Sequence, residues 1–234
     1  MKRLSWLALL FAILYAVLIL LPAFLSAQFG PYSLMKNGDI LDIITPIILI
    51  PLYWLLFQLV PGQLPRQVPM LLFMALAGAW AAGQGMHLSA NSIGHLLSSA
   101  GGGDAYKLTH FYDEDLSHYL WHLGVVGLSA LILYRQWRYS FSAPTEGLAA
   151  TIVGGLIYGF TYVASVLEAG TAPLGVPFAI AVAFFGLIWG RKRFRQQPMT
   201  TFFVVAYTLA TLLIIVWFIW HGGLPEPSEV GLID

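Results

Sequence analysis

The chain has 234 residues, of which 59% are hydrophobic and only 9% are charged. A soluble globular protein carries about 25% charged residues, so this composition excludes a chain folded for water and indicates an integral membrane protein. The absence of cysteine excludes disulfides and thiolate metal sites, and a net charge of zero gives no support for nucleic-acid binding.

Seven apolar runs have roughly the 20 residues that a membrane-spanning helix needs. They are predicted at Leu4–Leu25, Ile40–Val60, Val68–Met86, Leu116–Leu133, Leu148–Leu167, Leu174–Trp189 and Thr200–Trp220. The third run is expected to continue as a polar helix to about Ser98, and the longest loop is expected at Ser98–Tyr112. The first run is too long for the apolar part of a signal peptide, so we expect it to be retained. The sequence thus predicts an all-α polytopic bundle that forms one domain over residues 1–234.

Lysine and arginine residues collect on one side of this bundle when the chain is threaded through the seven spans. With the N-terminus in the cytoplasm, only Lys36 and Lys107 lie outside. The cytoplasmic segments then hold Lys2, Arg3, Arg66, Arg135, Arg138, Arg191, Lys192, Arg193 and Arg195. Because positive residues favour the cytoplasmic side, the pattern predicts a multi-pass protein of a bacterial-type plasma (inner) membrane, with its C-terminus on the periplasmic or extracellular side.

All six histidines fall in the outer half of the predicted bundle, and the fourth helix carries the densest group. Glu114, His118 and His122 stand four residues apart, and Asp115 precedes His118 by three, so all four share a helix face. A neutral imidazole is the commonest metal ligand, and ionisable groups inside a membrane usually mark function. We therefore expect His118 and His122 to bind a metal ion, with Glu114 or Asp115 as ligand, orienting group or general base.

Two neighbouring predicted helices carry polar stripes at helical spacing. They are Gln84, His87, Asn91 and His95 on the third helix, and Tyr158, Thr161, Ser165 and Glu168 on the fifth. A polar stripe that faced lipid would be costly, so both should face the bundle interior or a wet cavity. Alternatively, the first stripe only joins helices, and Glu168 is a solvated helix end. Gly155 and Gly159 provide a small-residue surface for close helix contact.

Depth along the helices decides which groups can meet. By the helical rise of about 1.5 Å per residue, His87, His118, His122 and His221 should form one layer. The predicted ligands are His118, His122 and His87, with His221 as the next candidate. His95 lies about 12 Å further along its helix, so it reaches the ion only if that helix bends near Gly94.

The remaining polar residues of this layer are expected to surround the ion. Asp113 is expected to cap the fourth helix or to line the cavity with Gln84, Ser165, Glu168 and His95. Asn91 is a candidate for polarising a substrate carbonyl, as is Ser117, and His110 is expected to be a bystander in the loop.

The chemistry of a histidine-rich site without thiolates favours zinc first, then iron or copper. Because a zinc-bound water has a pKa of about 7, such a site with a nearby carboxylate suffices for hydrolysis or group transfer on a membrane lipid or lipid-linked substrate. Two other classes stay open. One is a redox protein with non-haem iron, copper or haem, the latter held by His87 and His118. The other is a metal or proton transporter or sensor. The sequence leaves the oligomeric state open.

Seven helices with a buried set of His, Asp and Ser residues resemble the alkaline ceramidase and adiponectin-receptor superfamily of membrane metal hydrolases. The matching residues are His118 and His122 as a His-x-x-x-His pair, His87 as a third histidine and Asp113 as the acid. The resemblance implies zinc held by three histidines and cleavage of amide-linked lipids. The family carries its pair on the last helix, whereas the last predicted helix of this chain has only His221.

Overall fold

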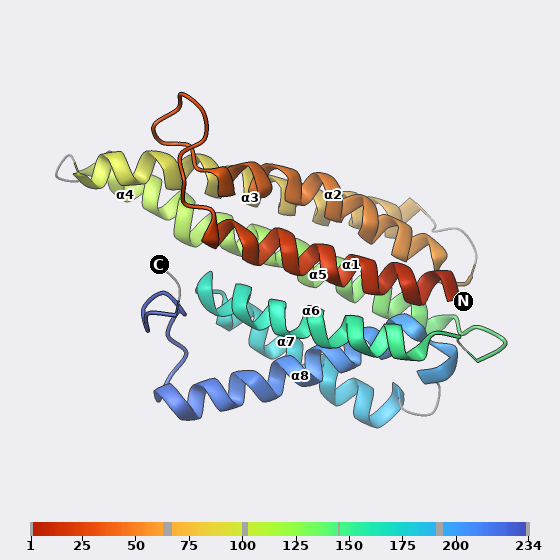
Figure 1. The fold of residues 1–234 in the computed structure, drawn as a ribbon. Coiled ribbons are helices and arrows are strands. Elements are labelled where there is room, and N and C mark those ends of the chain that lie inside the picture. The colour runs from red at the N-terminus through yellow and green to blue at the C-terminus, as the bar shows by residue number, and fades with distance from the viewer. Residues whose placement is uncertain (1, 63–66, 100–102, 145, 191–193, 233–234) are drawn as a thin grey trace.

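A computed structural model describes residues 2–62, 67–99, 103–144, 146–190 and 194–232 (Figure 1). The described residues contain no strand, only an isolated bridge between Gln28 and Lys36, which confirms the all-α prediction. Six described helices are long and apolar enough to cross a membrane, and Ala172–Ile188 forms a shorter apolar helix, so the chain has the build of a multi-pass membrane protein.

The long helices run back and forth along a common axis. In chain order all the α-helices are α1 (Lys2–Leu20), α2 (Asn37–Leu59), α3 (Gln67–Ser99), the short α4 (Asp104–His110), α5 (His118–Arg138), α6 (Leu148–Glu168), α7 (Ala172–Phe185) and α8 (Pro198–His221). The 3-10 segments are η1 (Leu21–Phe24) and η4 (Phe194–Gln196), and the π-helical segments are η2 (Phe111–Ser117) and η3 (Gly186–Gly190).

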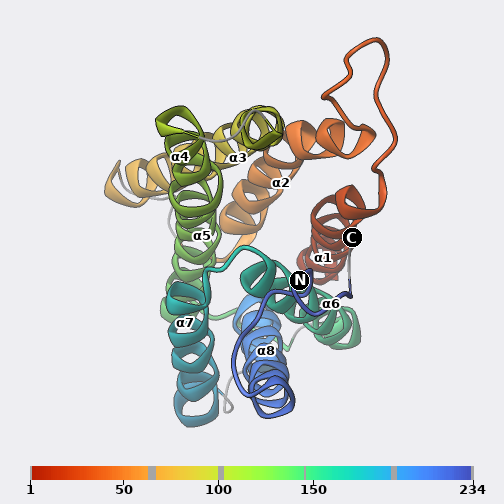
Figure 2. The same cartoon turned by 90° about the vertical axis from the view of Figure 1, so that its left-hand side faces the viewer.

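The bundle has two distinct ends (Figures 1 and 2). One, which we call the N-terminal end, holds the start of α1 with Lys2 and Arg3, the end of α5 with Arg138, and η4 with Arg195. The other, the C-terminal end, holds the 25–36 connection, the α6–α7 turn and the segment after α8. Of the basic residues used to predict orientation, Arg66, Arg191, Lys192 and Arg193 lie outside the described residues.

The fourth span differs from its prediction. The loop expected at Ser98–Tyr112 is wrong from Asp104 onward, because α4, η2 and α5 form one continuous helical segment, Asp104–Arg138, and the expected start at Leu116 is also wrong. Hydropathy marks where a helix becomes apolar, whereas this helix begins in its polar part, just after the positive-φ residue Gly103. Asp104 in the first turn favours that start through the helix dipole.

Close helix contacts follow the small residues as predicted. A Cβ atom added to Gly155 would lie 2.7 Å from the Phe202 carbonyl oxygen, and one added to Gly159 would overlap the backbone of Ala206. These glycines therefore let the backbones of α6 and α8 touch, as small residues do between helices in lipid.

The bundle interior contains a cluster of hydroxyl groups. The Tyr53 hydroxyl lies 2.9 Å from that of Tyr158 and 3.1 Å from the Ser129 hydroxyl, which joins α2, α5 and α6. Thr161 and Ser165 of the predicted α6 stripe are also buried, so the expectation that this stripe faces the interior is confirmed. Mutual hydrogen bonds satisfy hydroxyls that would be costly in a membrane interior.

Candidate functional site

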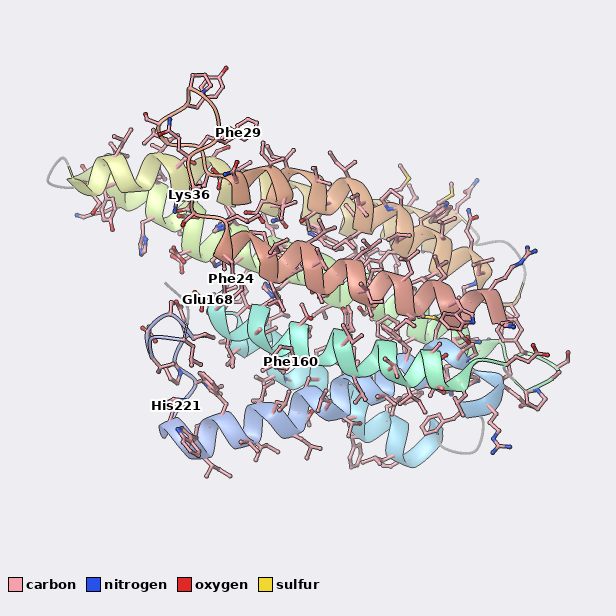
Figure 3. The ribbon with its side chains drawn as sticks, in the orientation of Figure 1. Phe24, Phe29, Lys36, Phe160, Glu168 and His221 are labelled. Atoms are coloured by element: carbon pink, nitrogen blue, oxygen red, sulfur yellow. The ribbon has the colours of Figure 1, made fainter. Side chains whose placement is uncertain are left out.

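A cavity of about 1030 Å³ opens at the C-terminal end of the bundle. Its wall comes from the ends of α1 and η1, from α2, α3, η2 and α5, from α6 and α8, and from the segment after α8. Figure 3 labels five residues on this wall from four regions of the chain: Phe24, Lys36, Phe160, Glu168 and His221. The cavity therefore brings residues far apart in the sequence to one compartment.

Two histidines and one carboxylate meet at the α3 side of the cavity. His87 Nδ1 lies 2.7 Å from Asp113 Oδ1 and 3.2 Å from His118 Nε2. Asp113 and His118 are 7% and 6% exposed, so these polar groups are removed from bulk water. Burial of a carboxylate requires a compensating positive charge or strong hydrogen bonds, and at this position the facing group is the His87 imidazole.

The π-helical segment η2 explains why Asp113 reaches His87. In an α-helical register the residues beside His118 would be Glu114 and Asp115, as the sequence predicted. A π turn closes its hydrogen bond five residues away, which brings the residue at i−5, Asp113, to the side of His118. The expectation that Asp113 caps a helix is therefore wrong, because it lies inside a continuous helical segment. Asp115 is exposed and does not line the cavity.

Glu114 completes this side of the cavity. Its Oε2 lies 3.8 Å from His118 Nδ1, and its side chain is 45% exposed, so it is in contact with both the imidazole and water. His118 Nδ1 is buried and has no hydrogen-bond partner within the described part of the chain. Glu114 is thus a carboxylate that can reach a substrate or a bound water without breaking a buried interaction.

A hydrogen-bond chain fixes α3 against α2 beneath the histidines. Gln84 Nε2 donates to Asp42 Oδ1 at 3.2 Å, and Trp80 Nε1 donates to Gln84 Oε1 at 3.3 Å. Gln84 and Asp42 both line the cavity. Gln84 therefore has the lining role that the sequence predicted, and it holds Asp42 toward the same compartment.

His122 points away from the cavity. Its Nδ1 lies 3.0 Å from the backbone oxygen of His118, its ring packs on Trp121, and it is absent from the cavity wall. Its Nε2 is buried without a hydrogen-bond partner among the described residues. The structure thus brings His118 to His87, and it does not bring His122 to the same place.

The other predicted residues spread over the cavity wall or lie outside it. Asn91, Ser165 and Glu168 line the wall, and Glu168 Oε2 accepts a hydrogen bond from the Ser228 backbone at 3.1 Å. His221 lines the α8 side, where its ring packs on Trp217 at 4.3 Å between centroids.

Two of the remaining candidates, Ser117 and His110, take no part in the cavity wall. Ser117 is buried with its hydroxyl bonded to the Asp113 carbonyl, and the ring of His110 stacks on Tyr106. The helix α3 continues through Gly94 without a break, and the side chain of His95 lies outside the described residues, so the expectation for His95 stays a prediction.

The described residues contain no group of three or more His, Asp or Glu side chains placed so that they could hold a metal ion. No family model, curated protein or solved structure matches the chain. The resemblance to the alkaline ceramidase and adiponectin-receptor superfamily therefore remains an expectation, and the chemistry of the site has to be argued from its own residues.

Trp121 and Glu226 are two of the wall residues to which the sequence assigned no site role. Trp121 lies one residue before His122 and was hidden among apolar neighbours. Glu226 belongs to a polar segment after α8 without helical periodicity, so only the fold shows that this segment returns to the cavity. Burial, followed by the charges of Glu168, Glu229 and Glu114, raises the pKa of Glu226.

Proposed function

We propose that this protein is a membrane-embedded, metal-dependent enzyme that hydrolyses or transfers a group on a lipid or lipid-linked substrate. The observation that carries the proposal is the meeting of His87 and His118 at the wall of a large cavity, with Asp113 buried behind His87 and outside the wall that it was expected to line. Buried ionisable groups that converge within a membrane protein are a default sign of a functional site.

The spacing of the ligand atoms supports a shared ion. Two nitrogens that each lie 2.0–2.1 Å from a tetrahedral zinc ion are about 3.3 Å apart. His87 Nδ1 and His118 Nε2 are 3.2 Å apart, which fits that spacing. His87 Nδ1 and Asp113 Oδ1 are 2.7 Å apart, a hydrogen-bond distance that has to widen before both atoms can bind the ion. We propose these three as the ligands, with a side-chain adjustment that closes the set around the ion, because the described residues show no complete group.

The protein groups around the proposed ion have separate tasks. A bound zinc ion supplies hydroxide at neutral pH by lowering the pKa of its water to about 7. Glu114, half exposed and beside His118, accepts a proton as general base. Asn91 lies on the same wall, where its amide can hold a substrate oxygen. Asp42, fixed by Gln84, adds negative charge that favours a cation in this region.

A lipid substrate is supported by the walls of the cavity. Phe24, Phe160, Val216 and Trp220 line it and are also strongly exposed on the bundle surface, so the cavity borders the region where lipid chains lie. We further propose that the C-terminal end faces outward in a plasma membrane, because most of the described lysines and arginines lie at the N-terminal end, and Lys36 and Lys107 lie at the other.

Non-haem iron chemistry is the second candidate for the same residues. Two histidines and one carboxylate form the ligand set of iron oxygenases, and His87, His118 and Asp113 provide that set. This candidate predicts oxygen consumption with the iron-loaded protein, whereas the hydrolase predicts product release without oxygen.

Metal removal tests the proposal. Purified protein in a nonionic detergent, mixed with a total lipid extract from its host, is expected to release a fatty acid or a headgroup fragment that mass spectrometry detects. A chelator should lower that rate at least about a hundredfold, and added zinc should restore it, because the ion provides several kcal/mol of transition-state stabilisation. Recovery only with iron and oxygen would favour the second candidate. Unchanged release from metal-free protein would contradict both.

A further inference from the structure

The cavity wall formed by the end of α6 and the segment after α8 is acidic. Glu168 ends α6, and Glu226 comes from the segment after α8, next to the α6–α7 turn at Gly170. The Ser228 backbone donates to Glu168, and the Glu226 backbone donates to Glu229 Oε2 at 3.0 Å. Backbone hydrogen bonds thus hold this segment across the end of the cavity, where it keeps two carboxylates facing inward.

The charge of the whole wall is strongly negative. Among its described residues the carboxylates are Asp39, Asp42, Glu114, Glu168 and Glu226, and the one lysine or arginine is Lys36. An ion bound at His87, Asp113 and His118 compensates only the inner part of this charge. Burial, followed by the neighbouring carboxylates, raises the pKa of Glu226. The outer part of the wall repels an anionic headgroup and attracts a cationic one.

Aromatic rings accompany these acids. Trp217 and Trp220 on α8 line the cavity within ten residues of Glu226, and Trp220 is 82% exposed. The faces of indole rings attract alkylated ammonium groups, which pair an apolar surface with positive charge. Phe160 lies eight residues before Glu168 on α6, so the apolar wall runs about 12 Å toward the middle of the bundle (Figure 3).

The polar floor of the cavity lacks one interaction. His118 Nδ1 is buried, belongs to a wall residue and has no hydrogen-bond partner within the described residues. A buried polar atom of this kind costs free energy unless a ligand or water satisfies it. The cavity therefore combines four features of one binding site: carboxylates, aromatic rings, the apolar wall beside Phe160 and the unpaired His118 Nδ1.

We infer that the cavity takes an amphiphile with an ammonium-bearing headgroup. The headgroup lies between Glu168 and Glu226, and the hydrocarbon chain lies against the apolar wall beside Phe160. The inference deepens the proposed function by assigning its substrate class, and it rests on that proposal in treating the bound lipid as the substrate. It excludes lipids whose headgroup carries net negative charge.

Binding by the metal-free protein tests this inference separately from catalysis. The probes are dodecyltrimethylammonium and dodecyl sulfate, which share a chain and differ in headgroup charge, added to chelator-treated protein in a nonionic detergent. Tryptophan fluorescence, with Trp217 and Trp220 on the wall, reports binding. The cationic probe is expected to bind at least about tenfold more tightly than the anionic one, a difference worth about 1.4 kcal/mol.

Charge-neutralising variants identify the residues. Glu226→Gln and Glu168→Gln are each expected to weaken binding of the cationic probe about five- to tenfold, and a thermal melt checks that both variants are folded. Asp104→Asn is the matched control, because Asp104 is fully exposed and outside the cavity wall. Equal affinity for both probes, or equal effects of all three substitutions, would overturn the inference. Charge selectivity in a protein that binds no metal would leave the inference standing while the proposed function failed.

Discussion

His118→Ala is expected to remove the bound metal ion and to lower turnover by about a thousandfold or more. His118 contributes one of two imidazoles to the proposed ion, and its Nε2 lies 3.2 Å from His87 Nδ1. Loss of a ligand from a three-ligand site removes the ion, and with it several kcal/mol of catalysis. The measurement is metal content after gel filtration, together with the rate of product release from lipid.

Two other histidines provide the controls for this prediction. His110→Ala changes an exposed ring that only stacks on Tyr106, and His122→Gln changes a buried ring outside the cavity wall. Both variants should keep the metal. The comparison separates the site in the structure from the His118–His122 pair that the sequence predicted. Metal loss in His122→Gln with full metal content in His118→Ala would contradict the proposed ligand set.

Asp113→Asn is expected to weaken metal binding at least about a hundredfold. The substitution keeps the size of the side chain but removes the charge that lies 2.7 Å from His87 Nδ1. Even carboxylates that only orient a histidine ligand contribute about ten- to a hundredfold to metal affinity, and a direct ligand contributes more. Competition with a chromophoric zinc chelator measures the affinity.

Asp115→Asn is the matched control, because it makes the same change two residues later on an exposed side chain. Its metal affinity should stay within about twofold of wild type. The pair of variants thus tests the π-helical register of η2, which puts Asp113 beside His87. A larger effect of Asp115→Asn would instead support the α-helical register that spacing alone predicted, and it would contradict the site.

The membrane bundle could be predicted from composition, because an apolar run of about twenty residues seldom forms anything other than a membrane-spanning helix. The start of the fourth helical segment at Asp104 could not be predicted from hydropathy. Hydropathy locates the apolar part of a helix and gives no information on a polar part that extends beyond it. The contact of His87 with His118 could be predicted, because the helical rise places the two residues at the same depth on two straight helices.

The details of the site needed the fold. A π turn leaves no clear signature in residue spacing. The sequence therefore could not show that Asp113, rather than Asp115, lies beside the histidines. His122 shares the face of His118 in an ideal helix, yet its side chain bonds to the backbone oxygen of His118 and does not line the cavity. The position of Glu226 on the cavity wall could not be predicted, because no periodicity in the sequence shows that the segment after α8 returns to the cavity.

X-ray absorption spectroscopy of the metal-loaded protein tests the central claim most directly, since it counts the imidazoles bound to the ion. Wild-type protein is expected to show two imidazole nitrogens and additional oxygen ligands at about 2.0–2.2 Å, the range for zinc. His87→Ala, reloaded with excess zinc, should retain at most one imidazole. Identical spectra for the two proteins, or a wild-type protein that takes up no metal, would contradict an ion shared by His87 and His118.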